Sequence, residues 1–163
     1  MRSRCSFRCC STRCPARGWY RSRARTAWTG AALGQAAARA VERLGRNAVA
    51  LASTDLTHYG SEYYGFDPMG AGPEAHRWSK EVNDGAFLER VLALDAEGAA
   101  ERGEADRSAC GPQAAAAAIA FAQARGATEG VLLEHVTSWE RDPERGAPRN
   151  FVGYAAVVFV RKG

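Results

Sequence analysis

The sequence predicts one α/β domain, in which helices flank a parallel or mixed β-sheet. A helical pattern over residues 30–45 leads through a short turn into an apolar run, Val49–Ala52. A helix, a turn and a buried strand in this order are typical of a βαβ unit. Two later runs, Val131–Ser138 and Phe151–Val160, are rich in β-branched and aromatic residues and predict further strands. At 163 residues the chain is long enough to bury a sizeable core.

The positive charge of the chain is concentrated at its start. The net charge is +4, yet Met1–Trp28 holds many of the arginines and no acidic residue, and the rest of the chain has more acidic than basic side chains. A role in nucleic-acid binding would depend on this segment alone, and we rank that role last. No apolar run is long enough to cross a bilayer, so the sequence predicts no membrane segment.

Met1–Trp28 has no helical or strand period and holds four of the five cysteines: Cys5, Cys9, Cys10 and Cys14. A zinc knuckle would need a second pair of ligands, and a secretory signal would need an apolar central region; this segment has neither. A basic arm that binds RNA or DNA remains an alternative. A shifted reading frame explains more of this unusual composition. Permitted codons can be chosen for residues 4–23 such that the same DNA, read in a frame moved back by one nucleotide, encodes VQLPLLQYALPGARLVPIA. We favour this interpretation, which predicts that residues 1–28 are disordered or badly packed and that the domain spans residues 29–163.

The first helix and strand follow from their patterns. Gly45 lies where a helix C-cap is expected, after apolar residues that recur at three- and four-residue steps: Leu33, Ala37, Val41 and Leu44. Val49–Ala52 is then expected to be a buried strand, because a strand covered on both faces reads as a continuous apolar run.

The polar turn after this strand, Ser53–Gly60, is the first candidate site. In open α/β sheets ligands collect where loops leave the carboxyl ends of strands, so Asp55 and His58 are placed for chemistry. The alternative is a turn whose serine, threonine and aspartate side chains only bond their own backbone. The composition gives the two interpretations equal weight.

The middle of the chain predicts a loop and two helices. The aromatic stretch up to Pro73 either lines a pocket for a flat ligand or packs as a surface loop. His76 lies early in the next helix among charged neighbours and is expected to be a solvated surface histidine. Asp95–Ala105 predicts a short surface helix that begins at a capping residue. The longer helix, Glu74–Leu94, could bend at Gly85, and its apolar stripe comprises Trp78, Val82, Phe87, Leu88, Val91 and Leu92.

Cys110 lies just before another helix, Gln113–Arg125, and is the second candidate. The start of a helix favours the thiolate, which is the metal-binding and nucleophilic form of cysteine. The alternative is a small buried hydrophobe, which is the commoner role of a lone cysteine. His135 in the next strand is expected to have a role in the core or on the sheet surface. That strand and the last one should form an antiparallel pair.

Four segments together resemble the Memo family, also described as AmmeMemoRadiSam system protein B, a relative of the LigB-type class III extradiol ring-cleaving dioxygenases. Ser53–Gly60 is similar to the family's S-(S/T)-D-(L/F)-(S/C/T)-H-(Y/W)-G, and Ala109–Gly111 to its (I/A)-C-G before a helix. Leu132–Ser138 is similar to a strand that ends in (Q/T)-S, and Val152–Ala156 to the terminal V-(G/S)-Y-A-A.

The resemblance implies a three-layer sandwich, incomplete at its N-terminus, with a non-haem iron or copper ion in a cleft. His58 matches the family's acid/base histidine beside the metal, and Cys110 matches a cysteine that replaces a metal-binding carboxylate. Asp55 would orient His58 or its loop. The family's other metal-site histidines lie in upstream G-x-(W/F)-Y-P and P-H-A-G segments, so the site here is expected to be incomplete; His76 and His135 do not lie in such motifs.

The sequence therefore leaves two functions open. One is a cytoplasmic metal-dependent oxidoreductase site that uses His58, Asp55 and Cys110. The other is a non-enzymatic module that binds a small molecule or a peptide in a cleft with a vestigial site. Substrate and metal identity do not follow from the residues. Only one cysteine lies beyond residue 28, which fits a reducing compartment.

Overall fold

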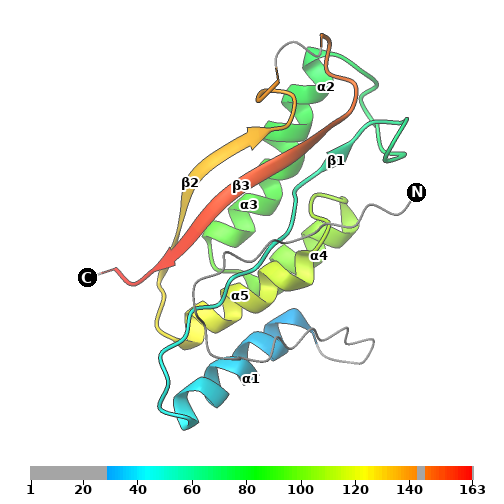
Figure 1. Ribbon diagram of the computed structural model, residues 1–163. Coiled ribbons are helices and arrows are strands. Elements are labelled where there is room, and N and C mark those ends of the chain that lie inside the picture. Colours follow the sequence, from blue (N-terminus) through cyan, green and yellow to red (C-terminus); the bar gives the residue numbers. More distant parts are fainter. Residues whose placement is uncertain (1–28, 143–145, 163) are drawn as a thin grey trace, which may run out of the picture.

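The computed structural model describes residues 29–142 and 146–162. The expectations for Met1–Trp28 concern residues outside these ranges and stay predictions. No described helix is long and apolar enough to cross a membrane. The elements of this mixed α/β structure (Figure 1) are α1 Gly30–Arg43, β1 His58–Tyr59, α2 Pro73–Arg77, η1 Trp78–Asp84, α3 Gly85–Leu92, α4 Ala96–Ala105, α5 Pro112–Ala124, β2 Glu129–Thr137 and β3 Phe151–Val160.

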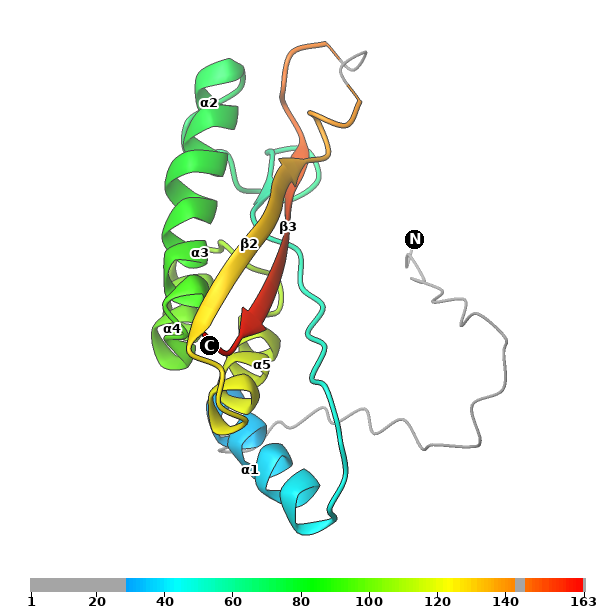
Figure 2. The same cartoon turned by 90° about the vertical axis from the view of Figure 1, so that its left-hand side faces the viewer.

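The sheet is antiparallel in the described part of the chain, with the strand order β1-β3-β2. The two long strands pair from Glu129 opposite Val160 to Thr137 opposite Gly153, which confirms the predicted antiparallel pair. β1 pairs with the start of β3, where His58 lies opposite Val152. Figure 2 shows the continuous α2–η1–α3 helix on one side of the β2–β3 ribbon. The extended chain that leads into β1 lies on the other side.

The main core lies where α3, α4 and α5 meet β3. Its buried residues include Phe87 of α3 and Ile119 of α5, surrounded by small alanines of α4 and α5. Ala155, Val157 and Phe159 of β3 pack against this cluster at alternate positions, as expected for one face of a strand.

The predicted helices are confirmed, and the capping roles predicted for Gly45 and Asp95 are found. The Thr29 side chain accepts a hydrogen bond from the N–H of Ala32 at the start of α1, and Gly45 after its end has a φ of 57°. Asp95 caps α4 by accepting the N–H of Gly98 at 2.9 Å. α4 packs against α5 and buries several small residues, so it is more enclosed than a surface helix.

Val49–Ala52 does not form the predicted buried strand. The segment lies outside any strand, and Val49 and Leu51 are each 94% exposed. An apolar strand is buried only when neighbouring strands and helices cover it. Within residues 29–142 and 146–162 no strand pairs with this segment, so the predicted parallel or mixed sheet is not formed there.

Two details of the Glu74–Leu94 helix also differ from prediction. His76 is only 9% exposed and packs in the interior, so the expected surface histidine is wrong. Val82 belongs to the predicted apolar stripe, yet it is 55% exposed. The middle of the helix, η1, is π-helical, and a π segment shifts the faces on which later side chains lie. A periodicity of 3.6 residues therefore misplaces Val82.

The aromatic stretch after His58 packs as an ordered loop against the helix and β3. Tyr59 is fully buried and its ring stacks on Phe151 at 4.8 Å, while Phe66 and Trp78 lie around it. Arg107 holds the loop from outside by donating hydrogen bonds to two of its backbone carbonyls and placing its guanidinium over the Phe66 ring.

Candidate metal centre

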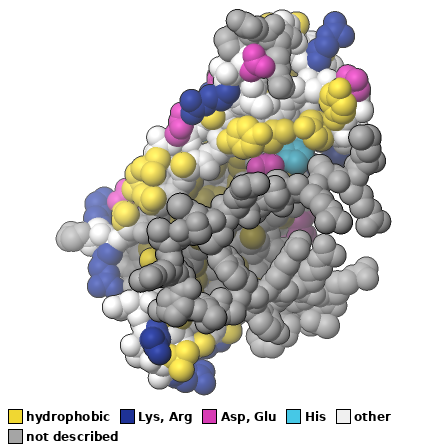
Figure 3. All heavy atoms as spheres, viewed as in Figure 1, with side chains coloured by type: hydrophobic (Ala, Val, Ile, Leu, Met, Phe, Trp, Pro, Cys, Tyr) yellow, Lys and Arg dark blue, Asp and Glu magenta, His cyan; other side chains and the backbone are white. Residues whose placement is uncertain are grey.

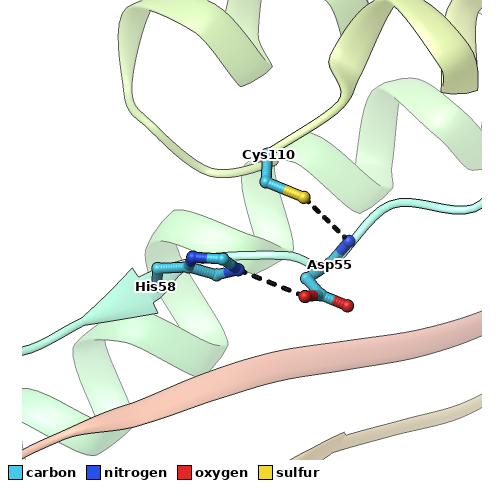
Figure 4. Close-up of side chains that lie close together, drawn as sticks. All are labelled: Asp55, His58 and Cys110. Atoms are coloured by element: carbon cyan, nitrogen blue, oxygen red, sulfur yellow. Dashed lines mark hydrogen bonds and ion pairs between the residues drawn. The ribbon is translucent and has the colours of Figure 1, made fainter. Parts of the chain in front are cut away.

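Cys110 is fixed against Asp55 by two reciprocal hydrogen bonds. The Asp55 N–H donates to Sγ of Cys110 at 3.3 Å, and the Cys110 N–H donates to the Asp55 carbonyl at 3.0 Å. Figure 4 shows the sulfur extending from the loop before α5 toward the segment that leads into β1. These bonds bring two separate candidate segments of the sequence into one site. Cys110 is exposed, so it is not the small buried hydrophobe considered as an alternative.

Thr54 adds further contacts between the segment that carries Asp55 and the segment that carries Cys110. Its Oγ1 accepts the N–H of Gly111 at 2.8 Å, donates to the Asp55 carbonyl at 2.9 Å, and lies 3.6 Å from the sulfur of Cys110. Gly111 precedes α5, so Thr54 serves a backbone N–H at the helix start. The Ser53–Gly60 turn thus binds another segment of the chain as well as its own backbone.

His58 completes the group from the first residue of β1. Its Nε2 lies 3.3 Å from Oδ2 of Asp55, with the two side chains 34% and 48% exposed. The ring of Tyr64 lies beside the imidazole, with 5.0 Å between ring centroids. The histidine is therefore held on one side by a carboxylate and on another by an aromatic ring, and it stays accessible to a ligand.

The three side chains fit a single metal ion by their chemistry and spacing. One ligand atom from each of Asp55, His58 and Cys110 lies within 4.8 Å of the others. Bonds from a metal to nitrogen, oxygen or sulfur are about 2.0–2.3 Å, so ligands of one ion lie up to roughly twice that distance apart. Imidazole, carboxylate and thiolate together suit a transition metal better than magnesium or calcium. Among the described residues, Asp55, His58 and Cys110 are the three potential metal ligands that the structure brings this close together.

A buried polar network supports the segment that carries His58. Asp84 is fully buried, accepts the N–H of Thr57 at 2.9 Å, and lies 3.2 Å from Nε2 of His135. Asn83 donates to the hydroxyl of Thr57 at 2.9 Å. Gly153 leaves the room for the carboxylate, since a Cβ there would lie 2.2 Å from Oδ2 of Asp84. The backbone immediately before His58 is thereby anchored to the helix.

His76 is not part of the candidate metal centre. Its Nε2 lies 2.8 Å from Oγ1 of Thr137, and its ring packs against Trp139. Burial lowers the pKa of the His76 imidazole below its usual 6.5, outweighing the opposite effect of Glu140. For Glu140, burial raises the pKa, but hydrogen bonds from Lys80 and from the Thr137 N–H outweigh it and hold the pKa below its usual 4.5.

The sequence profile of the Memo-like protein family matches residues 22–158. The chain belongs to this family. A MEMO1 family protein of Pyrococcus abyssi is 39% identical over 132 residues, which cover 80% of this chain and 44% of the relative. A MEMO1 family protein of Methanopyrus kandleri is 38% identical over 130 residues, covering 79% of this chain and 40% of that protein. A third, from Thermococcus kodakarensis, is 35% identical over 130 residues, covering 79% and 43%.

The chain thus spans less than half the length of the Memo-family relatives it matches. No solved structure was found to match it. The profile covers the Ser53–Gly60 turn, Cys110, and most of both long strands, so the motifs on which the resemblance rests lie inside the matched region.

Sequence reasoning on this Memo-family chain missed the support from Asp84, although a signal was present. Asp84 precedes Phe87, Leu88 and Val91 by three, four and seven residues, which is the spacing of one helical face. An acidic residue on an otherwise apolar face indicates a buried carboxylate that needs partners. The partners, Thr57 and His135, lie in distant segments and do not follow from local pattern.

Proposed function

We propose that Asp55, His58 and Cys110 form an oxidoreductase site related to the class III extradiol ring-cleaving dioxygenases, in which His58 and Cys110 bind a metal ion and Asp55 orients His58. The observation that carries the proposal is the convergence of three different donor atoms within 4.8 Å from two distant segments. Membership of the Memo-like family supports it, because the motifs carrying these residues are the ones that resemble that superfamily.

In this proposal Cys110 and His58 are the ligands from this chain. A thiolate ligand moves the metal preference from the iron(II) typical of histidine and carboxylate sites toward softer ions such as reduced copper. An iron or copper ion held here would supply binding and activation of dioxygen. Two ligands leave coordination positions open for a substrate or for ligands from outside the described residues.

His58 and Asp55 would also handle a proton. With 3.3 Å between Nε2 of His58 and Oδ2 of Asp55, the carboxylate can orient the imidazole and stabilise it when it is protonated. The exposed fraction of the imidazole leaves a substrate hydroxyl access to the ring. A nitrogen bound to a metal cannot take up a proton, so His58 would act as proton acceptor and donor only while it is not coordinated, and Asp55 would stay a positioning group. We place this chemistry in the cytoplasm, where a free Cys110 stays reduced.

A second candidate function is a non-enzymatic binding module. It is favoured by a groove of about 490 Å³ lined mainly by apolar side chains of residues 48–52, α5 and β3. Such a module could take a peptide or a small molecule without using metal. The two functions differ in one measurable property, the stoichiometric uptake of metal that depends on His58 and Cys110.

The test is anaerobic equilibrium dialysis against iron(II) or copper(I), with bound metal measured by mass spectrometry. Because Cys5, Cys9, Cys10 and Cys14 could bind metal adventitiously, all four are replaced by serine in the starting chain. We expect about one equivalent of bound metal, lost in His58→Ala and Cys110→Ser. The exposed Asp67→Asn on the adjacent loop is the control and should retain the metal. Uptake that is absent, or that survives both site substitutions, would reject the proposal and favour the binding module.

A further inference from the structure

The loop that follows β1 places an aromatic side chain against a candidate metal ligand. The ring of Tyr64 lies 5.0 Å from the imidazole of His58, measured between centroids, with 50° between the two ring planes. The carboxylate of Asp55 lies 3.3 Å from Nε2 of the same imidazole. On the face viewed in Figure 3, hydrophobic side chains border a histidine and an acidic side chain that lie side by side at the surface. Two contacts of different kinds therefore restrict the rotation of the His58 ring, a polar one from Asp55 and an aromatic one from Tyr64.

Arg107 fixes the backbone of this loop from the segment that carries Cys110. Its Nη2 donates to the carbonyl of Tyr64 at 2.9 Å, and its Nη1 donates to the carbonyl of Gly65 at 3.1 Å. The guanidinium also lies over the ring of Phe66, 4.8 Å from its centroid. Because the donors of a guanidinium form a rigid planar fork, two such bonds fix the direction as well as the position of the groups they hold. One side chain thus connects the loop before α5 to the loop that carries Tyr64.

The backbone of Arg107 adopts a conformation that disfavours arginine. Its φ is 54°, in the left-handed region that glycine and asparagine adopt far more readily. The side chain is exposed, so burial in the core does not account for an arginine at this position. The contacts of the guanidinium with the loop offset the unfavourable backbone conformation. Replacement of Arg107 by glycine would therefore remove these contacts without straining the backbone.

We propose that Arg107 is a positioning residue of the candidate metal centre. By holding the loop after β1, it keeps Tyr64 against His58 and so fixes the imidazole in the orientation that binds metal. The effect of Arg107 on metal affinity rests on the proposed function, whereas its effect on the contact between Tyr64 and His58 does not. Loss of a contact that orients a metal ligand typically weakens metal binding by about 10–100-fold.

The first measurement is the NMR spectrum of the metal-free chain at a pH of about 8.5, where an ordinary histidine is neutral. The chain has three histidines, so His58→Ala identifies the ring resonance of His58. The ring current of Tyr64 displaces this resonance, and Tyr64→Leu gives its position without the displacement. In Arg107→Gly the resonance should move most of the way to that position. Arg107→Asn removes the same guanidinium, also suits the left-handed backbone, and should give the same result. A resonance that stays at its original position in both variants would overturn the proposal.

The second measurement is the dissociation constant for cobalt(II), in the chain whose first four cysteines are replaced by serine. Arg107→Gly and Tyr64→Leu should each raise the constant by about tenfold, and the double variant should raise it no further, because Arg107 acts through Tyr64. A residue that only stabilises the fold would add its effect to that of Tyr64→Leu. Additive effects, or a constant that Arg107→Gly leaves unchanged, are therefore incompatible with the proposed role.

Arg161→Gly is the matched control. Arg161 is also exposed and also donates to two consecutive backbone carbonyls, those of Arg125 at 3.0 Å and Gly126 at 3.3 Å. These residues follow α5, at the opposite end of that helix from Cys110, so neither the His58 resonance nor the dissociation constant should change. Equal effects of Arg161→Gly and Arg107→Gly would refute a specific role of Arg107. If the unsubstituted chain binds no cobalt, the proposed function fails by itself, and the His58 resonance alone decides whether Arg107 holds Tyr64 in place.

Discussion

Oδ2 of the fully buried Asp84 lies 3.2 Å from Nε2 of His135, which is itself only 14% exposed at its side chain. The other carboxylate oxygen accepts the N–H of Thr57, one residue before His58. This pair therefore joins the helix, the strand β2 and the segment that carries the candidate metal ligand.

The Asp84–His135 pair is expected to couple strongly in a double-mutant cycle. Asp84→Ala should lower the free energy of unfolding by about 3–5 kcal/mol, because the buried N–H of Thr57 and the ring of His135 lose their partner. With His135→Ala as the second substitution, the coupling should exceed about 1.5 kcal/mol. Chemical denaturation of the four proteins measures it.

The exposed pair Glu134–Arg141 on the same strand and the loop after it is the matched control. Both side chains are more than half exposed, so their coupling should stay below about 1 kcal/mol. Equal coupling in the two pairs would show that burial does not strengthen the Asp84–His135 interaction.

The contact between α1 and α5 depends on Gly34. A Cβ at this position would lie 2.1 Å from the carbonyl oxygen of Ala117, so Gly34→Ala must push the two helices apart. We expect a loss of about 1–3 kcal/mol in the free energy of unfolding. Gly85→Ala is the control, because a Cβ there would come no closer than 3.8 Å to the carbonyl oxygen of Lys80. It should stabilise the chain by up to about 1 kcal/mol through helix propensity. Thermal melts of the two variants should shift in opposite directions.

Acid should destabilise the fold through His76 before it does so through Glu140. The pKa of His76 is lowered in the folded protein, so the unfolded chain binds more protons as the pH falls through 6.5, and stability decreases. The pKa of Glu140 is also lowered, so its contribution is present above pH 4.5 and is lost at lower pH. Unfolding free energies measured from pH 8 to pH 4 should fall first near pH 6.5.

His76→Gln tests this assignment, because glutamine can still bond to Oγ1 of Thr137 but does not titrate. The decrease near pH 6.5 should shrink in this variant while the one below pH 4.5 remains. An unchanged profile would mean that other groups set the acid response.

Much of the fold follows from local pattern. The helices, the antiparallel pair β2–β3, and the position of Cys110 just before α5 agree with the sequence, because caps, periodicity and β-branched runs act over a few residues. The prediction that Val49–Ala52 is a buried strand fails, because burial depends on neighbouring elements that the described residues do not provide for this segment. The same limit applies to His76, whose charged sequence neighbours concealed its place in the interior.

For the candidate site, pattern and resemblance selected Asp55, His58 and Cys110 separately. That Cys110 bonds to the backbone of Asp55 while His58 bonds to the carboxylate is a tertiary fact, which no spacing in the sequence contains. The hydrogen bond from the Thr57 N–H to Asp84, which anchors the backbone before His58, is likewise a tertiary contact.

The most direct test of the metal centre is the absorption spectrum of the chain titrated with cobalt(II), in the variant that lacks Cys5, Cys9, Cys10 and Cys14. A thiolate bound to cobalt gives a sulfur-to-metal charge-transfer band, and our account predicts this band at about one equivalent. It should disappear in Cys110→Ser and in His58→Ala, and weaken in Asp55→Asn. A spectrum without the band, or one that is identical in Cys110→Ser, would contradict a metal site built on these three residues.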